Sequence, residues 1–297
     1  MSDAYSEQRA ATEGTTLLNN DAVVRRFGEL AAGVFSLAVL GFLGWILSTQ
    51  VNYRLLQSVF PRFVEAFRLV VFIVVVSSVA SVTLGTLMGL ARISSSPLTA
   101  RIAKGYVEFF RGTPLLFQLF VIFFGIPRLW PPGQFPIGDW RVPAAMIGLT
   151  LNHIAYVAEA IRGGVGAVED GQLEAARSLG MSHVQAMRKV VLPQAWRNAL
   201  PAIGNDQIIL VKDTSLLTVI AIPEIMSVFR NINNNQLDPW TPLVWVCLFY
   251  LLVTMSMSLA VSVLERRADW TSGEKREEET GLRGLLASIG RGFGRRL

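Results

Sequence analysis

The sequence predicts an all-α protein that crosses a membrane several times. Of its 297 residues, 52% are hydrophobic and only 16% are charged, and the mean hydropathy is +0.43. A soluble domain of this length is less apolar. The apolar residues gather in segments of about 20 residues, the length that a helix needs to cross the hydrocarbon of a bilayer. We therefore expect a polytopic membrane protein, because a helix satisfies its own backbone hydrogen bonds in lipid.

The segments that come close to this length are residues 31–48, 66–91, 106–126, 142–161, 202–223 and 241–264. The first follows a polar stretch, 1–29, and we interpret it as an uncleaved helix because Ile46-Leu47-Ser48 is a poor small-x-small cleavage site. The fifth, 202–223, is the weakest candidate because it holds three charged residues. The pattern predicts six spans.

The lysines and arginines beside these segments predict the orientation, because such residues are enriched in short loops on the cytoplasmic side. One set of flanks holds Arg25, Arg26, Arg92, Arg101, Lys104, Arg162, Arg177, Arg188, Lys189, Arg197, Arg266 and Arg267. The opposite loops hold fewer: Arg54, Arg62, Arg128, Arg141 and Arg230. We therefore expect both termini, and the loop after the fourth segment, to face the cytoplasm (N-in, C-in).

The polar loop between the fourth and fifth segments, residues 164–198, carries the most informative motif. Its fixed points are Glu174-Ala175-Ala176, Gly180 and Leu192-Pro193. Acidic residues open the loop, where the helix dipole favours anions, and Gly180 can end a first helix. Ser182 and Gln185 then have the spacing of a capping box for a second helix that must yield at Pro193. We interpret this arrangement as a socket for another protein, and the alternative is an ordinary amphipathic loop helix.

The sequence contains no recognisable pattern of an active site. The phosphate-binding pattern G-x-x-x-x-G-K-[ST] does not occur, so any ATP must be hydrolysed by another subunit. His153, His183 and the single cysteine, Cys247, form no cluster at metal-ligand spacing. The basic residues lie beside apolar spans rather than among aromatic residues, which argues against nucleic acid as a partner. We expect no catalysis, no metal and no cofactor in this chain.

Four blocks of the sequence resemble a known family. They are Tyr106–Leu116, which contains Arg-Gly-Thr-Pro; Ala155–Glu159 with Arg162-Gly163-Gly164; Gly171–Ala176 through Leu192–Ala195; and Lys212–Leu216. Together they resemble the membrane subunit of a type I, binding-protein-dependent ABC importer, in the histidine/glutamine-type family of polar amino acid permeases. The loop alone indicates an ABC importer permease, whereas the first and last blocks indicate the amino acid branch.

This resemblance implies a five-helix permease core over about residues 63–264. The helix at 30–49 is then an addition to the core, and it lies between a cytoplasmic N-terminal segment, 1–29, and the core itself. Residues 265–297 are expected to form a cytoplasmic tail. A further departure from the family is His153, at a place where its members often have a small residue.

The resemblance also implies the function and the partners. A permease of this family passes a polar amino acid or related zwitterion across the bacterial cytoplasmic membrane, beside a second permease subunit that is identical or homologous. An extracytoplasmic solute-binding protein delivers the substrate, and a cytoplasmic ABC ATPase dimer, which holds ATP and Mg²⁺, docks on the loop. The residues of this chain that match the docking motif are Gly171, Glu174, Ala175, Ala176, Gly180, Leu192 and Pro193.

Polar residues within the apolar segments indicate the substrate path. Asn152, Tyr156 and Glu159 share one helical face because they are four and three residues apart. Asp206 and Asp213, seven residues apart, also align. An amino acid carries both charges, so a site within the membrane needs opposite charges or oriented dipoles. The candidate lining is Thr113, Pro114, Gln118, Asn152, Tyr156, Glu159, Asp206, Lys212, Asp213 and Ser215.

Lys212 is expected to have an ion-pair partner. An unpaired lysine at the bilayer centre costs about 2.5–3.5 kcal/mol on insertion scales, so we expect a carboxylate on another helix, with Glu159 as the leading candidate. Two other interpretations of the charges stay open. They could tie helices together in a closed pore, or they could be the relay groups of an ion-coupled transporter or channel. An intramembrane enzyme would additionally require a nucleophile with a base.

The tail from Lys275 onward is charged and rich in glycine, and we expect it to be disordered. In the alternative, its apolar residues lie on the anionic headgroups of membrane lipid, because they fall at helical spacing beside arginines. These residues are Leu282, Leu285, Leu286, Ile289 and Phe293, with Arg291, Arg295 and Arg296.

Overall fold

The computed structural model describes the backbone of residues 2–268 and the side chains of residues 24–264. Within this part of the chain every regular element is a helix, so the predicted all-α class is confirmed. The tail from Lys275 onward, for which disorder and a lipid-bound helix were considered, lies outside the described residues.

The longer helices are α1 (Ser2–Thr49), α2 (Tyr53–Arg92), α3 (Pro97–Gly112), α5 (Arg141–Gly166), α8 (Leu192–Asp213), α9 (Ile225–Gln236) and α10 (Trp240–Ala268). Shorter elements connect them. They are α4 (Leu115–Phe120), the π-helix η1 (Val121–Gly125), the 3-10 helix η2 (Ile126–Leu129), α6 (Asp170–Ser178), α7 (His183–Ala186), the π-helix η3 (Met187–Val191) and the 3-10 helix η4 (Thr214–Ile220).

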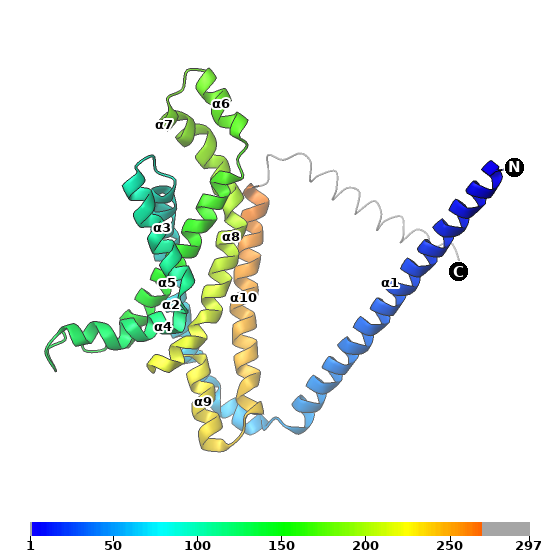
Figure 1. Ribbon diagram of the computed structural model, residues 1–297. Coiled ribbons are helices and arrows are strands. Elements are labelled where there is room, and N and C mark those ends of the chain that lie inside the picture. The colour runs from blue at the N-terminus through cyan, green and yellow to red at the C-terminus, as the bar shows by residue number, and fades with distance from the viewer. Residues whose placement is uncertain (1, 269–297) are drawn as a thin grey trace.

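Helices α2, α5, α8 and α10 form the body of the molecule (Figure 1). Glycines allow these helices to approach closely. A Cβ atom at Gly85 of α2 would lie 2.6 Å from Cβ of Val157 in α5, and one at Gly204 of α8 would lie 2.3 Å from Cγ1 of Val261 in α10. Such contacts hold helices together in lipid, where no hydrophobic force pushes them together.

The N-terminal helix α1 stands apart from this body (Figure 1). Its apolar part, Val24–Thr49, is long enough to span a membrane and is left uncovered by the other described helices. The backbone is helical from Ser2 onward, so the polar N-terminal stretch continues the same helix. After a short connection, Asn52 begins α2 by accepting backbone N–H bonds from Arg54 and Leu55 at 3.1 and 3.2 Å.

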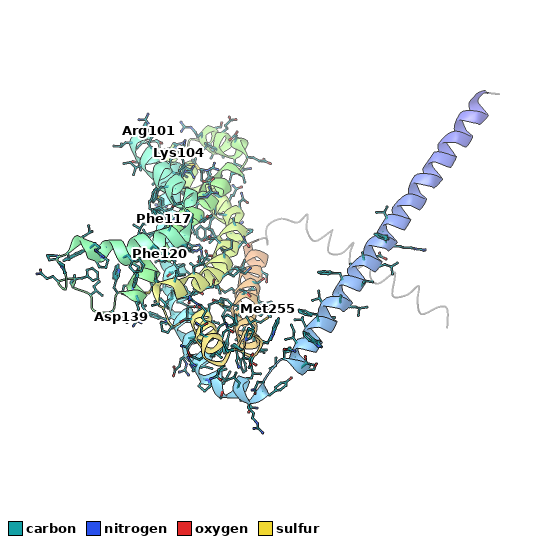
Figure 2. All side chains as sticks on the ribbon, turned by 60° about the horizontal axis from the view of Figure 1, so that its bottom comes forward. Arg101, Lys104, Phe117, Phe120, Asp139 and Met255 are labelled. Carbon is teal, nitrogen blue, oxygen red and sulfur yellow. The ribbon has the colours of Figure 1, made fainter. Side chains whose placement is uncertain are left out.

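The third predicted span, 106–126, is bent rather than straight. Between α3 and α4 the helix axis turns by 102°, and Thr113 and Pro114 are extended at the turn. A proline favours extended backbone in the residue before it and lacks the N–H that a continuing helix needs. The segment from α4 to η2 therefore projects to one side of the bundle, with Phe117 and Phe120 on it (Figure 2).

The described residues contain fewer clear spans than the six predicted. Four helices are long and apolar enough to cross a membrane: Val24–Thr49, α2, α5 and α10; the bent pair of α3 and α4–η2 would make five. Residues 202–223 do not form one helix, because α8 ends at Asp213 and η4 follows to Ile220. The six-span count and the N-in, C-in orientation stay predictions. The α6–α7 loop and the last turns of α10 lie toward the same end of the bundle (Figure 1).

Candidate functional site

The loop between α5 and α8 begins with the predicted helix and stop. Helix α6 has Asp170 in its first turn and Arg177 in its last. Gly180 follows with a φ of +83°, and its N–H donates to the Arg177 carbonyl at 3.0 Å. The Met181 N–H donates to the Ala176 carbonyl at 3.2 Å. These two bonds make a Schellman stop, in which a residue with positive φ ends the helix.

The second helix of the loop begins as predicted but does not end at Pro193. The Ser182 hydroxyl accepts the Gln185 N–H at 3.3 Å, and the Gln185 side-chain oxygen accepts the Ser182 N–H at 2.9 Å. This is the predicted capping box. The prediction that the helix must yield at Pro193 is wrong, because η3 runs directly into α8 and places Pro193 in the first turn of α8. A proline is tolerated there, so the loop continues into a helix of the bundle.

Only part of the predicted docking motif faces outward. Glu174 and Ala175 are exposed, whereas Ala176 is 3% exposed and packs inside the loop. Leu179 and Val184 are large apolar side chains that are 80% and 73% exposed, a feature typical of a protein contact. The sequence prediction omitted them, although apolar residues in a polar loop were an available signal. The other docking candidates are exposed or half-buried: Gly171, Gly180, Leu192 and Pro193.

A polar cavity of about 390 Å³ lies where α3, α4, α5 and α8 meet. It is lined by Arg111, Gly112, Thr113, Pro114, Leu115, Asn152, His153, Tyr156, Asp206, Ile209 and Asp213. The fold therefore brings together Thr113, Pro114, Asn152, Tyr156, Asp206 and Asp213 of the predicted substrate path. Gln118, Glu159, Lys212 and Ser215, which were also predicted, do not line this cavity.

One wall of the cavity consists of a buried histidine, the buried carboxylate of Asp206 and the partly exposed carboxylate of Asp213. His153 is 1% exposed, and its Nδ1 lies 2.9 Å from Oδ1 of Asp206. Gln207 donates its side-chain N–H to the other oxygen of Asp206 at 3.0 Å. The His153 Nε2 lies 3.5 Å from Oδ2 of Asp213 and makes no hydrogen bond within the described structure. Each oxygen of Asp206 thus has a hydrogen-bond partner, whereas Asp213 lines the cavity with a side chain that is 28% exposed and has only the distant Nε2 of His153 beside it.

Gln118 is buried and holds the turn between α3 and α4. Its side-chain nitrogen donates to the carbonyl of Phe110 at 2.9 Å and to the hydroxyl of Thr113 at 2.8 Å. Its side-chain oxygen accepts an N–H from Asn152 at 3.0 Å. These bonds satisfy backbone groups that the broken helix leaves without partners. Gln118 therefore shapes the cavity rather than lining it.

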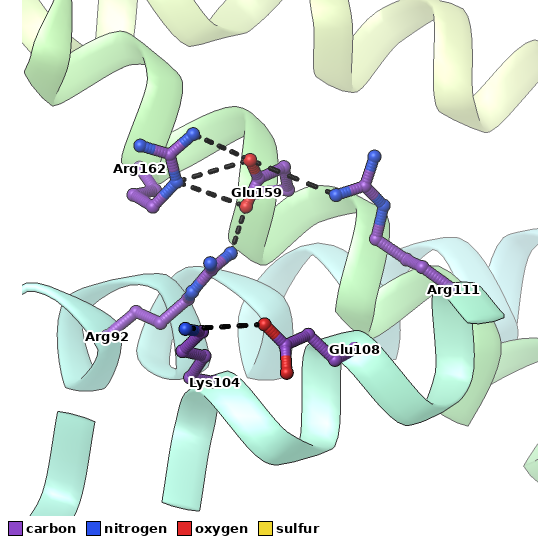
Figure 3. Close-up of polar contacts among 6 residues, drawn as sticks. All are labelled: Arg92, Lys104, Glu108, Arg111, Glu159 and Arg162. Carbon is purple, nitrogen blue, oxygen red and sulfur yellow. Dashed lines mark hydrogen bonds and ion pairs between the residues drawn. The ribbon is translucent and has the colours of Figure 1, made fainter. Parts of the chain in front are cut away.

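Glu159 lies in a separate ion cluster, which joins α2, α3 and α5 (Figure 3). Arg162, on the same helix, contacts its carboxylate at 2.7 Å, and Arg92 from α2 also forms an ion pair with it. Arg111, from the end of α3, is more distant, with Nη1 3.8 Å from Oε1 of Glu159. One carboxylate therefore interacts with three guanidinium groups.

The predicted pair of Lys212 and Glu159 is wrong, since the partners of Glu159 are arginines. Lys212 is exposed on α8, and in the described part of the chain no carboxylate lies within ion-pair distance of its ammonium. It lies in the last turn of α8, where the helix dipole favours a cation. Position on the helix, and not a partner across the bundle, accounts for this lysine.

A second cavity, of about 700 Å³, is lined by residues of η1 and η2 and of the segment that connects η2 to α5. Aromatic residues make much of its wall, and Asp139 and Arg141 pair there at 2.8 Å. The hydrogen bond from Arg141 lowers the pKa of the Asp139 carboxyl below its usual value. Asp139 and Arg141 satisfy each other, which leaves the cation Arg128 as the other charge of that lining. The smaller cavity, which has charges of both signs and a buried histidine, is therefore the better candidate for binding a zwitterion.

Metal ligation is not indicated by the geometry. Over the described residues, no group of three or more histidine, cysteine, aspartate or glutamate side chains is placed to hold an ion. The nearest approach to such a site is His153 with Asp206 and Asp213, where the histidine already uses one ring nitrogen for a hydrogen bond.

Comparisons with known proteins show the family of the chain. A family described as binding-protein-dependent transport system inner membrane component matches residues 81–270. The probable amino-acid permease protein YxeN of Bacillus subtilis is 34% identical over 216 residues, which make up 73% of this chain and 95% of that protein. The glutamine transport system permease protein GlnP of Escherichia coli is 32% identical over 224 residues, with 73% and 98% covered.

Among solved structures, an amino acid ABC transporter with histidines is 33% identical, with a TM-score of 0.66 over 73% of this chain and 99% of the other. The matched family region includes both the α6–α7 loop and all the residues that line the cavity. The chain belongs to the family of binding-protein-dependent transport system inner membrane components, the permease subunits of ABC importers, as the sequence predicted.

Proposed function

We propose that the chain is the permease subunit that passes a polar amino acid or related zwitterion across the bacterial cytoplasmic membrane, through the 390 Å³ cavity. The observation that carries this proposal is that charges of both signs lie on the cavity wall. Arg111 and Asp213 both line it. Zwitterions are bound by such opposed charges in a site with few water molecules. The names of the relatives, a glutamine permease among them, support the same substrate class.

The energy for transport is proposed to come from a separate ATPase dimer that binds ATP and Mg²⁺. The α6–α7 loop suits it because Glu174, Leu179 and Val184, which lie on either side of the glycine stop in the sequence, are all exposed. The loop is continuous with α8, which carries Asp206 and Asp213. A displacement of the loop can therefore be transmitted to the cavity through α8. A second permease subunit and an extracytoplasmic binding protein complete the proposed importer.

The test is uptake by the complex that co-purifies with this chain, reconstituted in proteoliposomes. ATP on the loop side should drive the uptake of a labelled amino acid only with loaded binding protein on the other side. Glu174→Lys reverses a charge at the docking surface, so it should abolish both uptake and stimulated ATP hydrolysis. Glu108→Lys, at an exposed position of α3, is the matched control and should retain both activities.

Two outcomes would contradict the proposal. Full stimulation in Glu174→Lys would show that the loop does not transmit the energy of ATP. Uptake driven by an ion gradient without ATP would favour the ion-coupled transporter instead.

A further inference from the structure

The connection between the α6–α7 loop and α8 is a single π-turn, η3. The Leu192 N–H donates to the Met187 carbonyl, five residues earlier, whereas an α-helix would use the carbonyl four residues earlier. Pro193 follows directly, and a proline has no N–H to donate to the Lys189 carbonyl. The wider turn therefore lies where the regular ladder of backbone bonds loses a donor. Turns of this kind are places where a helix bends.

Gln194 supplies a donor beside this gap. Its side-chain nitrogen donates to the Val190 carbonyl at 3.0 Å. The same nitrogen lies 3.5 Å from Oε1 of Gln172, in α6, which is the outer limit of a hydrogen bond. Gln194 is half-buried, and a hydrogen bond away from bulk water is electrostatically stronger than one in water. One side chain of α8 therefore contacts both the π-turn and the first helix of the loop.

Directly after the π-turn, α8 is fixed to α5. Ala195 and Ala199 are 2% and 1% exposed, and a Cβ atom at Gly164 of α5 would lie 2.3 Å from the Ala195 carbonyl oxygen. The Asn198 side chain also donates to the Gly164 carbonyl at 3.4 Å. From Ala195 onward the helix is thus part of the packed bundle.

On the other side of the π-turn, α6 and α7 are held to each other. The Schellman bonds follow α6, and the capping box begins α7. Ala176 and Ala186, one on each helix, are 3% and 0% exposed. Two stiff parts of the chain therefore meet at η3, and a force on the loop is expected to bend the chain there.

We infer that η3 is the hinge between the docking loop and the bundle, and that Gln194 is a positioning residue that stiffens this hinge, an inference that rests on the proposed function. With Gln194 in place, a displacement of the loop by the ATPase moves α8, and with it Asp206 and Asp213. Without the N–H groups of Gln194 the hinge bends, and part of the displacement is lost before it reaches the cavity.

The experiment uses the complex purified through this chain, reconstituted in proteoliposomes with loaded binding protein. The probe is a mixture of radiolabelled proteinogenic L-amino acids. Three quantities are measured: the amount of ATPase bound per permease, the rate of stimulated ATP hydrolysis, and the uptake per ATP hydrolysed. Gln194→Met keeps the length of the side chain and removes its N–H groups. ATPase binding should stay within about twofold of the wild type, whereas uptake per ATP should fall about threefold to tenfold, the range that one hydrogen bond sets.

Two further variants separate hydrogen-bond donation from side-chain size. Gln194→Glu has nearly the shape of the wild-type side chain but, when ionised, no donor group, so its loss should match that of Gln194→Met. Gln57→Met is the matched control, because Gln57 is exposed in α2 and its side chain makes no hydrogen bond within the described part of the chain. The control should leave all three quantities unchanged.

The stiffness of the hinge is measured directly with two spin labels. They are attached through Ser178→Cys in α6 and Trp196→Cys in α8, both at exposed positions, after Cys247→Ser has removed the native cysteine. The distribution of distances between the labels should be broader in Gln194→Met than in the wild type, because the loop then takes a wider range of angles to α8.

The outcomes separate the hinge from the transport function. If Gln194→Met or Gln194→Glu keeps the wild-type uptake per ATP, or if the distance distribution does not broaden, the role of Gln194 is overturned while amino acid import stands. If either variant no longer binds the ATPase, Gln194 only holds the loop in shape, and the inference is overturned in the same way. If the wild-type complex shows no ATP-driven uptake, the proposed function fails, and the inference fails with it.

Discussion

The α6–α7 loop and the helix bundle around the cavity use glycine in opposite ways. At Gly180, in the loop, a Cβ atom would meet no other atom within 4 Å, and the constraint is the φ of +83°. At Gly164, which lies in α5 below the loop, a Cβ atom would lie 2.3 Å from the carbonyl oxygen of Ala195. The loop is thus defined by local backbone conformation, whereas the bundle around the cavity is defined by contacts between distant segments.

This difference explains what each region can do. A loop with open space around its turn can fit a partner without disturbing the bundle. The cavity, in contrast, depends on helices that touch at their backbones, so its charges are held at fixed distances. Substitutions in the bundle around the cavity should therefore lower the stability of the fold. Substitutions in the loop should instead weaken the coupling to the ATPase, with little change in stability.

The largest effect is expected for His153→Ala. This change leaves the buried carboxylate of Asp206 with Gln207 as its one remaining hydrogen-bond donor. Removing one member of a buried pair costs about 3–5 kcal/mol. The free energy of unfolding, measured for the purified protein in detergent, should fall by that amount.

The control is the double variant His153→Leu with Asp206→Leu, in which the buried carboxylate of Asp206 is removed together with its partner. It should recover most of the lost stability, because apolar residues of similar volume replace such a pair at little cost. Equal losses in His153→Ala and in the double variant would show that the pair itself is not the source of the effect.

A smaller loss is expected for Gly164→Ala. The added methyl would overlap the carbonyl oxygen of Ala195 at 2.3 Å, and it would lie 3.0 Å from the Ala199 Cβ, so α5 and α8 must separate. Overpacking of this kind costs about 1–3 kcal/mol. Gly163→Ala is the matched control, since a Cβ there meets no atom within 4 Å. If both variants unfold at the same detergent or denaturant concentration, the close contact of α5 with α8 is not limiting.

Gly180→Val should cost about 1–3 kcal/mol locally, because a β-branched residue resists positive φ. The strain falls on the loop, so the bundle should unfold as in the wild type while ATPase association and stimulated hydrolysis are lost. Gly180→Asn, which tolerates left-handed backbone, should retain most of the activity. Loss of activity in both variants, with the loop intact, would mean that the side chain at position 180 matters in itself.

Local signals allowed much of the loop to be predicted. The capping box, the acidic start and the glycine stop each depend on residues within one turn of one another, and all three are present. The course of the chain at Pro193 was not predictable from the residue alone. A proline can end a helix or begin one, and the π-helix that precedes it turns the chain into α8.

Tertiary contacts decided the parts of the site that the sequence could not give. Helical periodicity correctly predicted that Asn152 and Tyr156 lie together. Glu159, which is on the same predicted face, instead forms ion pairs with three arginines, one on its own helix and two on other helices. The roles of His153 and Arg111 depend on partners that lie on other helices or beyond a bend. Only the packing of α3 and α8 against α5 reveals them.

The smallest effect is expected for Lys212→Met. The side chain is exposed and lies in the last turn of α8, where interaction with the helix dipole contributes about 0.3–1 kcal/mol. The unfolding free energy should fall by no more than that. Because Glu159 is bound by arginines, adding Glu159→Gln should give a loss equal to the sum of the two single losses, within about 0.5 kcal/mol. A coupling of more than about 1 kcal/mol in this double-mutant cycle would restore the predicted pair of Lys212 and Glu159, and it would mean that Arg92 and Arg162 do not satisfy that carboxylate.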